Sequence, residues 1–100
     1  MIQGTTPTHT FNIPFDTSTL KEVKVLYAQN DALVLEKHTS DCKLDSTSIS
    51  ITLTQEDTFL FDRKKPVEIQ IRVLTLGGDA LASVPEKIGV SKCLDSEVLT

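Results

Sequence analysis

Two histidines and two cysteines are the side chains of this chain best suited to hold a metal ion: His9, His38, Cys42 and Cys93. His38 and Cys42 are four positions apart, so the set is a nominal candidate for zinc. Structural zinc sites usually take paired ligands from one loop, for example two cysteines separated by two residues. The chain contains no such pair. We therefore expect no metal site, with His9 at the edge of the core, His38 in a turn and the cysteines in strands.

Nucleophilic catalysis would need a serine, threonine or cysteine beside a base that a third group holds in place. No motif of this kind surrounds His9 or His38, and the many serines and threonines fall at alternating polar positions that suit the solvent side of strands. The acidic residues Asp41, Asp45 and the pair 56–57 have surroundings typical of turns and helix caps. We predict no catalytic residue and no enzymatic activity.

The glycine pair and the loop aspartates are the remaining candidates for ligand binding. Gly77 and Gly78 lack the following lysine and helix of a phosphate-binding loop, so the pair predicts a turn. Asp41, Asp45 and Asp79 would bind calcium only with further oxygen ligands from nearby loops. Four Phe, one Tyr and no Trp leave few aromatic rings for stacking sugars or bases. No cofactor is expected, and a loop-based module for calcium or glycan is the alternative function.

Length and charge are those of one ordinary soluble domain. The chain has 100 residues, of which 39% are hydrophobic and 24% charged, and its formal net charge is -4. The only basic cluster is 63–65, so a nucleic-acid partner is disfavoured. No apolar run approaches the ~20 residues that cross a bilayer, and no secretory signal is visible. We expect one domain over 1–100, made in the cytoplasm with reduced cysteines; a disulfide would require the strands of Cys42 and Cys93 to be neighbours.

Hydrophobic side chains recur at every second residue along most of the chain, which is the period of half-buried β-strands. In 8–15 the inward set is His9, Phe11, Ile13 and Phe15. Prolines flank this run and cannot donate to a strand ladder, so we expect it at a sheet edge. Further strands are predicted at 21–29, 32–37, 42–44, 48–53, 67–74, 80–84 and 87–94.

Turn and cap signals separate these strands. Asn30 and Asp31 predict a hairpin turn, and two glycines before Asp79 predict another in which both supply positive φ angles. Thr54 and Asp57 have the spacing of a capping box, which predicts a short helical turn between the fifth and sixth strands. The tail 95–100 is expected to be frayed. Seven to eight short strands with one helical turn predict an all-β, immunoglobulin-like β-sandwich, although the Cys, Trp and Cys of antibody cores are absent.

Several stretches of the chain are similar to a known group of proteins. They are Gln3-Gly4-Thr5-Thr6-Pro7-Thr8-His9-Thr10-Phe11, Leu53-Thr54-Gln55-Glu56-Asp57-Thr58, Val67-Glu68-Ile69-Gln70-Ile71-Arg72-Val73-Leu74 and Gly78-Asp79-Ala80-Leu81-Ala82-Ser83. In these stretches the chain resembles small uncharacterised proteins encoded among phage structural genes in prophages of Gram-positive bacteria. The resemblance implies a component of a phage particle or of its assembly, and it brings no catalytic residues.

The expected function is therefore that of a non-catalytic protein–protein interaction module. An edge strand offers unpaired backbone groups that another chain can extend, and the stretch 3–11 is the best docking candidate. The expected partners are other phage structural proteins or another copy of the chain, with no nucleic acid and no membrane. The expected location is the host cytoplasm during assembly, or the virion.

Overall fold

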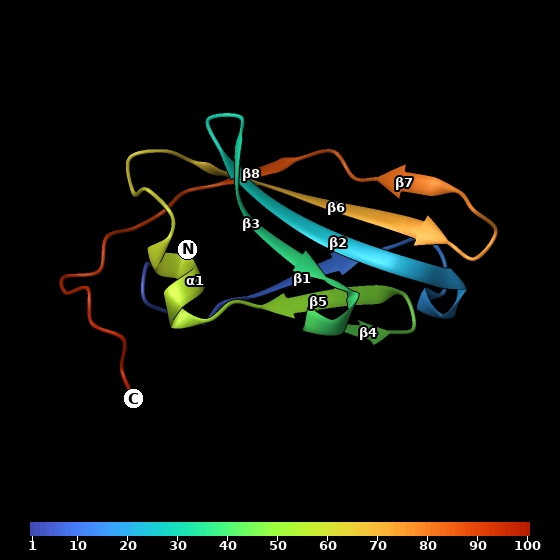
Figure 1. Cartoon of the computed structure of the whole chain (residues 1–100), viewed down its shortest axis with the longest axis horizontal. Coiled ribbons are helices and arrows are strands. Elements are labelled where there is room, and N and C mark those ends of the chain that lie inside the picture. The colour runs from blue at the N-terminus through green and yellow to red at the C-terminus, as the bar shows by residue number, and fades with distance from the viewer.

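Two antiparallel β-sheets packed face to face form the molecule in the computed structural model, which describes residues 1–100 (Figure 1). The helical segments are short: η1 (Thr17–Thr19), η2 (Thr39–Asp41) and α1 (Gln55–Phe59). The strands are β1 (Thr8–Asn12), β2 (Leu20–Gln29), β3 (Ala32–His38), β4 (Cys42–Asp45), β5 (Ser48–Thr52), β6 (Val67–Thr75), β7 (Ala80–Ala82) and β8 (Glu86–Ile88).

The order of the strands is that of an immunoglobulin-like sandwich. The small sheet has the order β1-β5-β4, and the larger has β3-β2-β6, with β7 and β8 both on the other side of β6. In immunoglobulin lettering, these are the B-E-D strands of one sheet and the C′-C-F-G strands of the other. The predicted all-β, immunoglobulin-like β-sandwich of seven to eight strands is confirmed: the structure has eight strands, with a helical turn between the fifth and sixth.

Alternating side chains from the two sheets meet to form the core. On β2, for example, Val23, Val25 and Tyr27 are all fully buried, while the residues between them lie on the outer face. Burial of these apolar surfaces is the main stabilising contribution to such a sandwich. The core contains eleven buried residues: Val23, Val25, Tyr27, Ile49, Ile51, Leu53, Phe61, Val67, Ile69, Ile71 and Val73.

Helix α1 closes one end of the sandwich and begins at the predicted capping box. Asp57 N–H donates to Thr54 Oγ1 (3.1 Å), and Thr54 N–H donates to Asp57 Oδ2 (2.9 Å). The buried Thr58 then holds the N-terminal segment, since its hydroxyl accepts from Gly4 N–H (2.9 Å) and donates to the Thr5 carbonyl (3.0 Å). Gly4 has a φ of +78°, a conformation that favours glycine.

Two of the predicted strands end earlier than expected. The strand predicted over 80–84 ends at Ala82, because at Ser83 the side-chain hydroxyl, and not the backbone carbonyl, accepts from Ile71 N–H (3.1 Å). The strand predicted over 87–94 leaves β6 after Ile88, whose partner is Val67. Pro66 precedes Val67 and has no N–H, so β6 offers no further pairing there.

The first strand and the second hairpin also differ in detail from the sequence prediction. Strand β1 ends at Asn12 instead of Phe15, although alternate residues continue to pack against the core up to Phe15. In the β6–β7 turn only Gly78 has a positive φ (+89°), and Gly77 does not. The Asn30 and Asp31 turn has φ angles of 52° and 64°, as a tight hairpin requires.

Candidate docking site

The four nominal zinc ligands come from four different segments. His9 lies on β1, His38 ends β3, Cys42 begins β4, and Cys93 lies in the C-terminal tail. Both cysteines are free thiols. The structure contains no group of three or more His, Cys, Asp and Glu side chains placed to hold a metal ion.

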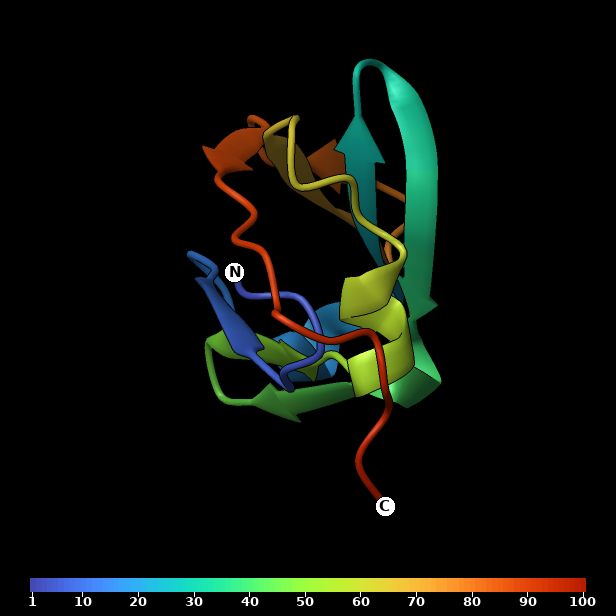
Figure 2. The same cartoon turned by 90° about the vertical axis from the view of Figure 1, so that its left-hand side faces the viewer.

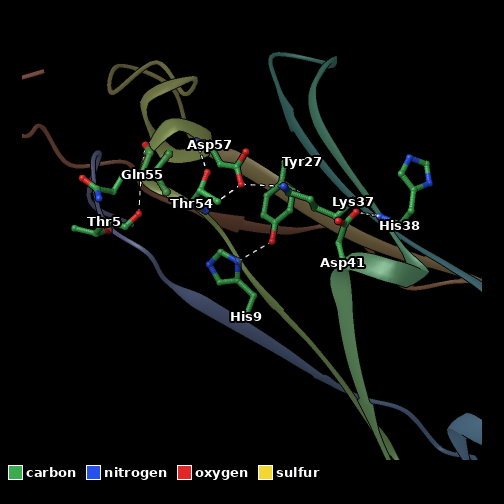
Figure 3. A network of polar contacts seen from close by, with 10 residues as sticks. Thr5, His9, Tyr27, Lys37, His38, Asp41, Thr54, Gln55 and Asp57 are labelled. Carbon is green, nitrogen blue, oxygen red and sulfur yellow. Dashed lines mark hydrogen bonds and ion pairs between the residues drawn. The ribbon is translucent and has the colours of Figure 1, made fainter. Parts of the chain in front are cut away.

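His9 has a structural partner in the core. Its Nδ1 lies 2.8 Å from the hydroxyl of Tyr27, and Figure 3 shows the two side chains pointing toward each other from β1 and β2. Burial, and then the N-terminal ammonium group, hold the pKa of His9 below its usual value. Burial, and then the nearby Cys42 and Asp57, raise the pKa of Tyr27 well above its usual value. Both rings are therefore neutral near pH 7, and the contact joins the two sheets.

The acidic candidates stabilise turns and helix starts. Asp41 Oδ2 accepts from His38 N–H (3.0 Å) at the start of η2. Asp57 caps α1 together with Thr54, and Asp79 N–H donates to Thr75 Oγ1 (3.0 Å) in the β6–β7 hairpin. The carboxylates of Asp41 and Asp57 thus cap short helical segments, which is the role expected from their surroundings in the sequence. Asp79 contributes its backbone N–H to the hairpin turn, and Asp45 is the last residue of β4. Calcium or glycan binding by the loops stays a prediction.

An ion pair between Lys37 and Asp57 links β3 to α1, and sequence reasoning did not find it. The Lys37 Nζ lies 2.9 Å from Asp57 Oδ2, and the two side chains are only 18% and 13% exposed (Figure 3). Burial would raise the pKa of Asp57, but hydrogen bonds from Thr54 and the charge of Lys37 outweigh it and hold the pKa below the ordinary value. The residues are 20 positions apart, so no local pattern in the sequence points to the pair.

Replacing Asp57 with asparagine should lower the free energy of unfolding by about 1 kcal/mol at pH 7, because the cap weakens and the ion pair is lost. A carboxyl with a lowered folded pKa stabilises the fold above its unfolded pKa, and that contribution disappears as pH falls through the folded pKa. The difference between the two proteins should therefore shrink below the ordinary value of 3.8. Urea unfolding at several pH values measures it. Glu56→Gln, at an exposed position, is the control, and a difference that does not change with pH would contradict the assignment.

An apolar groove opens between the two sheets on the flank formed by β1 and β7. It has a volume of about 540 Å³. Leu81 is paired with Val73 and so lies on the inner face, yet it is 45% exposed because no strand of the small sheet covers it. The apolar lining is continued by the segment after β1, and the groove is lined by Phe11, Ile13, Pro14, Phe15, Ile71, Val73, Leu81, Ala82 and Val84, with Thr10, Asn12, Ser83 and Glu86 as its polar members.

Strand β1 forms one border of this groove with a free edge. It lies at the end of the small sheet, so the edge position predicted for 8–15 is confirmed. The odd-numbered residues hydrogen-bond toward β5, as the bonds at both ends of the pairing show: Ile13 N–H donates to the Thr47 carbonyl (2.8 Å), and Leu53 N–H donates to the Pro7 carbonyl (2.9 Å). Since antiparallel strands alternate between hydrogen-bonded and non-hydrogen-bonded pairs, the backbone groups of the even-numbered residues face away from the sheet. They belong to Thr8, Thr10 and Asn12.

Strands β7 and β8 form the opposite border, which is also a sheet edge. Ser83 N–H donates to the Ile71 carbonyl (2.9 Å), and Thr75 N–H donates to the Asp79 carbonyl (2.9 Å). The backbone groups of the intervening even-numbered residues, Ala80 and Ala82, therefore face outward. The groove thus has unpaired backbone groups along both of its borders.

Only part of the predicted docking stretch 3–11 is a free edge. Gln3 is already bound, since its N–H donates to the Ser91 carbonyl (3.0 Å) and its Nε2 donates to the Phe61 carbonyl (2.8 Å). Gly4 and Thr5 are held by Thr58. In Figure 2 this N-terminal segment lies between β1 and the part of the chain around β8. The structure therefore confines the available edge to β1 and moves the candidate site to the flank beside it.

Comparisons with known proteins give a distant structural likeness. No protein-family description and no curated protein sequence matches the chain. Among solved structures, the V domain of amphioxus IgVJ-C2 aligns with 90% of this chain and 96% of that chain, at 12% sequence identity and a TM-score of 0.36. None of the helices has the length and apolar character needed to span a membrane.

Proposed function

We propose that this chain is a non-catalytic protein–protein interaction module of a phage particle or of its assembly. The observation that carries the proposal is the apolar groove bordered by the free edges of β1 and β7. The resemblance of 3–11 and 67–74 to proteins encoded among phage structural genes supports the biological setting. Its partners are then other phage structural proteins or another copy of the chain, met in the host cytoplasm or in the virion.

Physical chemistry favours this flank as the contact surface. Another chain can pair with an exposed strand edge through main-chain hydrogen bonds, while pockets beside the edge select its side chains. Natural proteins often block such edges with charged residues or prolines. The outward residues of β1, namely Thr8, Thr10 and Asn12, carry no charge. Pro7 and Pro14 lie just outside the strand, so the edge is open to pairing between them, over Thr8–Asn12.

Mass spectrometry of purified phage particles from a lysogen that carries the gene tests the proposal, and we expect the chain to copurify with them. Val84 is 83% exposed at the groove, so Val84→Asp should leave the fold intact while lowering recovery with the particles about tenfold, as loss of one interface anchor does. Leu33→Asp is the matched control, because Leu33 is 57% exposed on β3, at the far edge of the larger sheet. Equal recovery of the two variants would contradict the proposal.

Measurements on the purified chain distinguish the proposed function from the alternative, a loop-based module for calcium or glycan. A rise in melting temperature on addition of calcium, or binding on a glycan array that survives Val84→Asp, would favour a loop-based ligand-binding module. We expect neither, because the loop aspartates Asp41 and Asp79 are in separate turns.

A further inference from the structure

We propose that the groove receives one extended strand from another protein, which lies parallel to β8 and continues the line of Met1–Gln3. The strand carries apolar side chains at alternate positions and a basic side chain opposite Glu86. This inference deepens the proposed function and rests on it, since it names the occupant of the same flank.

The first residues of the chain already show how such a strand pairs. Met1 N donates to the Gly89 carbonyl (2.9 Å), and Ser91 N–H donates to the Met1 carbonyl (2.8 Å). These two bonds place Met1 beside Val90, and the bridge between Ile2 and Ser91 is parallel. Residues 1–3 thus pair in parallel with 89–91, through an isolated bridge on the edge that continues from β8.

The edge continues past the point where this short strand begins. Gly89 presents its carbonyl to Met1, so strand alternation turns the N–H and carbonyl of Lys87 to the same open side. A strand that extends the line of Met1 would donate to the Lys87 carbonyl and accept from the Lys87 N–H. Pairing would stop at Pro85, which has no N–H. The available edge therefore holds about five or six residues of a partner strand.

The direction of the side chains follows from the same alternation. Met1, Ile88 and Val90 pack against the core, so they lie on the inner side of the flank. Positions two, four and six before Met1 would therefore point into the groove. Position four lies beside Glu86, which is the only charged residue of the groove lining. A lysine or arginine there would be attracted to the Glu86 carboxylate.

Charge also argues that the strand comes from another protein and not from a second copy. The C-terminal tail 92–100 has neither helix nor strand and exposes apolar residues, among them Leu94 and Leu99, so it is the longest segment that a second copy could offer. Its two acidic residues, Asp95 and Glu97, outnumber its one basic residue, Lys92, and would be repelled by Glu86 in the groove. The tail is also held on its own molecule, because Gln55 Nε2 donates to the Leu99 carbonyl (2.9 Å) and Leu99 N–H donates to Gln55 Oε1 (2.7 Å). A neutral or basic apolar strand fits the groove better.

A six-residue extension fused directly before Met1 tests the geometry. The sequence Val-Thr-Lys-Thr-Val-Thr places valines at positions six and two and lysine at position four. We expect a rise in melting temperature of about 4–8 °C, as stabilisation of a domain of this size produces. We also expect roughly tenfold slower hydrogen exchange at the Lys87 and Gly89 amides, because they become hydrogen-bonded.

Three variants of the extension control for composition, charge and pairing. Thr-Val-Thr-Lys-Thr-Val has the same composition but shifts every side chain to the opposite face, so it should give no stabilisation. Exchanging the lysine for glutamate should remove part of the rise, and this difference should decrease with added salt. Proline at position two removes the N–H that would donate to Lys87, and it should also abolish the protection from exchange.

Each outcome decides the proposal. Equal melting temperatures for the two registers, or unprotected Lys87 and Gly89 amides in the first extension, would overturn it. Protection of these amides in the unmodified chain at high concentration would show that a second copy fills the groove, and would overturn it as well. Copurification with phage particles that persists after such a result would leave the proposed function standing without this strand.

Discussion

Replacing Tyr27 with alanine is expected to lower the free energy of unfolding by about 3–5 kcal/mol, the cost of removing a large buried ring. The Tyr27 side chain is fully buried between the sheets, and its ring centroid lies 5.6 Å from that of His9 and 5.8 Å from that of Phe61. Its loss would leave a cavity where the small sheet, the larger sheet and the segment after α1 meet. Neighbouring β-strands are hydrogen-bonded in place and can fill such a cavity only partly.

Tyr27→Phe separates the contribution of the ring from that of the hydroxyl. This variant keeps the packing and loses only the hydrogen bond to His9, so we expect a loss of about 1 kcal/mol. Urea unfolding followed by far-ultraviolet circular dichroism measures both variants, since Tyr27 is the only tyrosine and the chain has no tryptophan. Losses of similar size for the two variants would show that the hydroxyl, and not the ring, stabilises the core.

Gln29→Glu is expected to lower the free energy of unfolding by about 3 kcal/mol at pH 7. Gln29 is almost completely buried, and its amide nitrogen donates to the carbonyls of Asp62 (2.7 Å) and Lys65 (3.0 Å). Its amide oxygen accepts from Asp62 N–H (2.8 Å). A carboxylate of the same shape has no hydrogen to donate, so two backbone carbonyls would face a buried negative charge.

Two measurements make this prediction specific. Gln70→Glu is the matched control, because Gln70 makes a single bond, from its Nε2 to the Ser83 carbonyl (2.9 Å), and is less buried. We expect a smaller loss for it. The loss for Gln29→Glu should also decrease at acid pH, since the protonated carboxyl group can donate one hydrogen bond again. A loss that is the same at all pH values would contradict the assigned role of the amide.

The strands could be predicted from the sequence because their signal is local. In 21–29 the alternation of Val23, Val25 and Tyr27 with polar residues identifies both the strand and its buried face, and the structure has β2 there. The cap at Thr54 was equally visible, since Asp57 follows at a fixed spacing. Such features depend on neighbours a few residues away, and the backbone geometry of strands and helix starts determines that spacing.

The docking flank could be predicted only in part. The prolines around β1 indicated an edge strand, and the structure has one. No local pattern indicates that Leu81 would face inward and stay uncovered, because that depends on which strands of the other sheet lie opposite. The pairing of Met1–Gln3 with Gly89–Ser91 is likewise a contact between distant segments. Its hydrogen bonds involve only backbone groups, which leave no mark in the side-chain pattern.

The parallel contact between the first and last segments sets an order of events during folding. Met1 and Gly89 are separated by 88 positions, so the cost in chain entropy of joining them is among the largest in the molecule. A ribosome must have released residue 91 before this contact forms, whereas the β2–β3 hairpin can pair as soon as its short turn has emerged. We therefore expect the two sheets to assemble before Met1–Gln3 pairs with Gly89–Ser91.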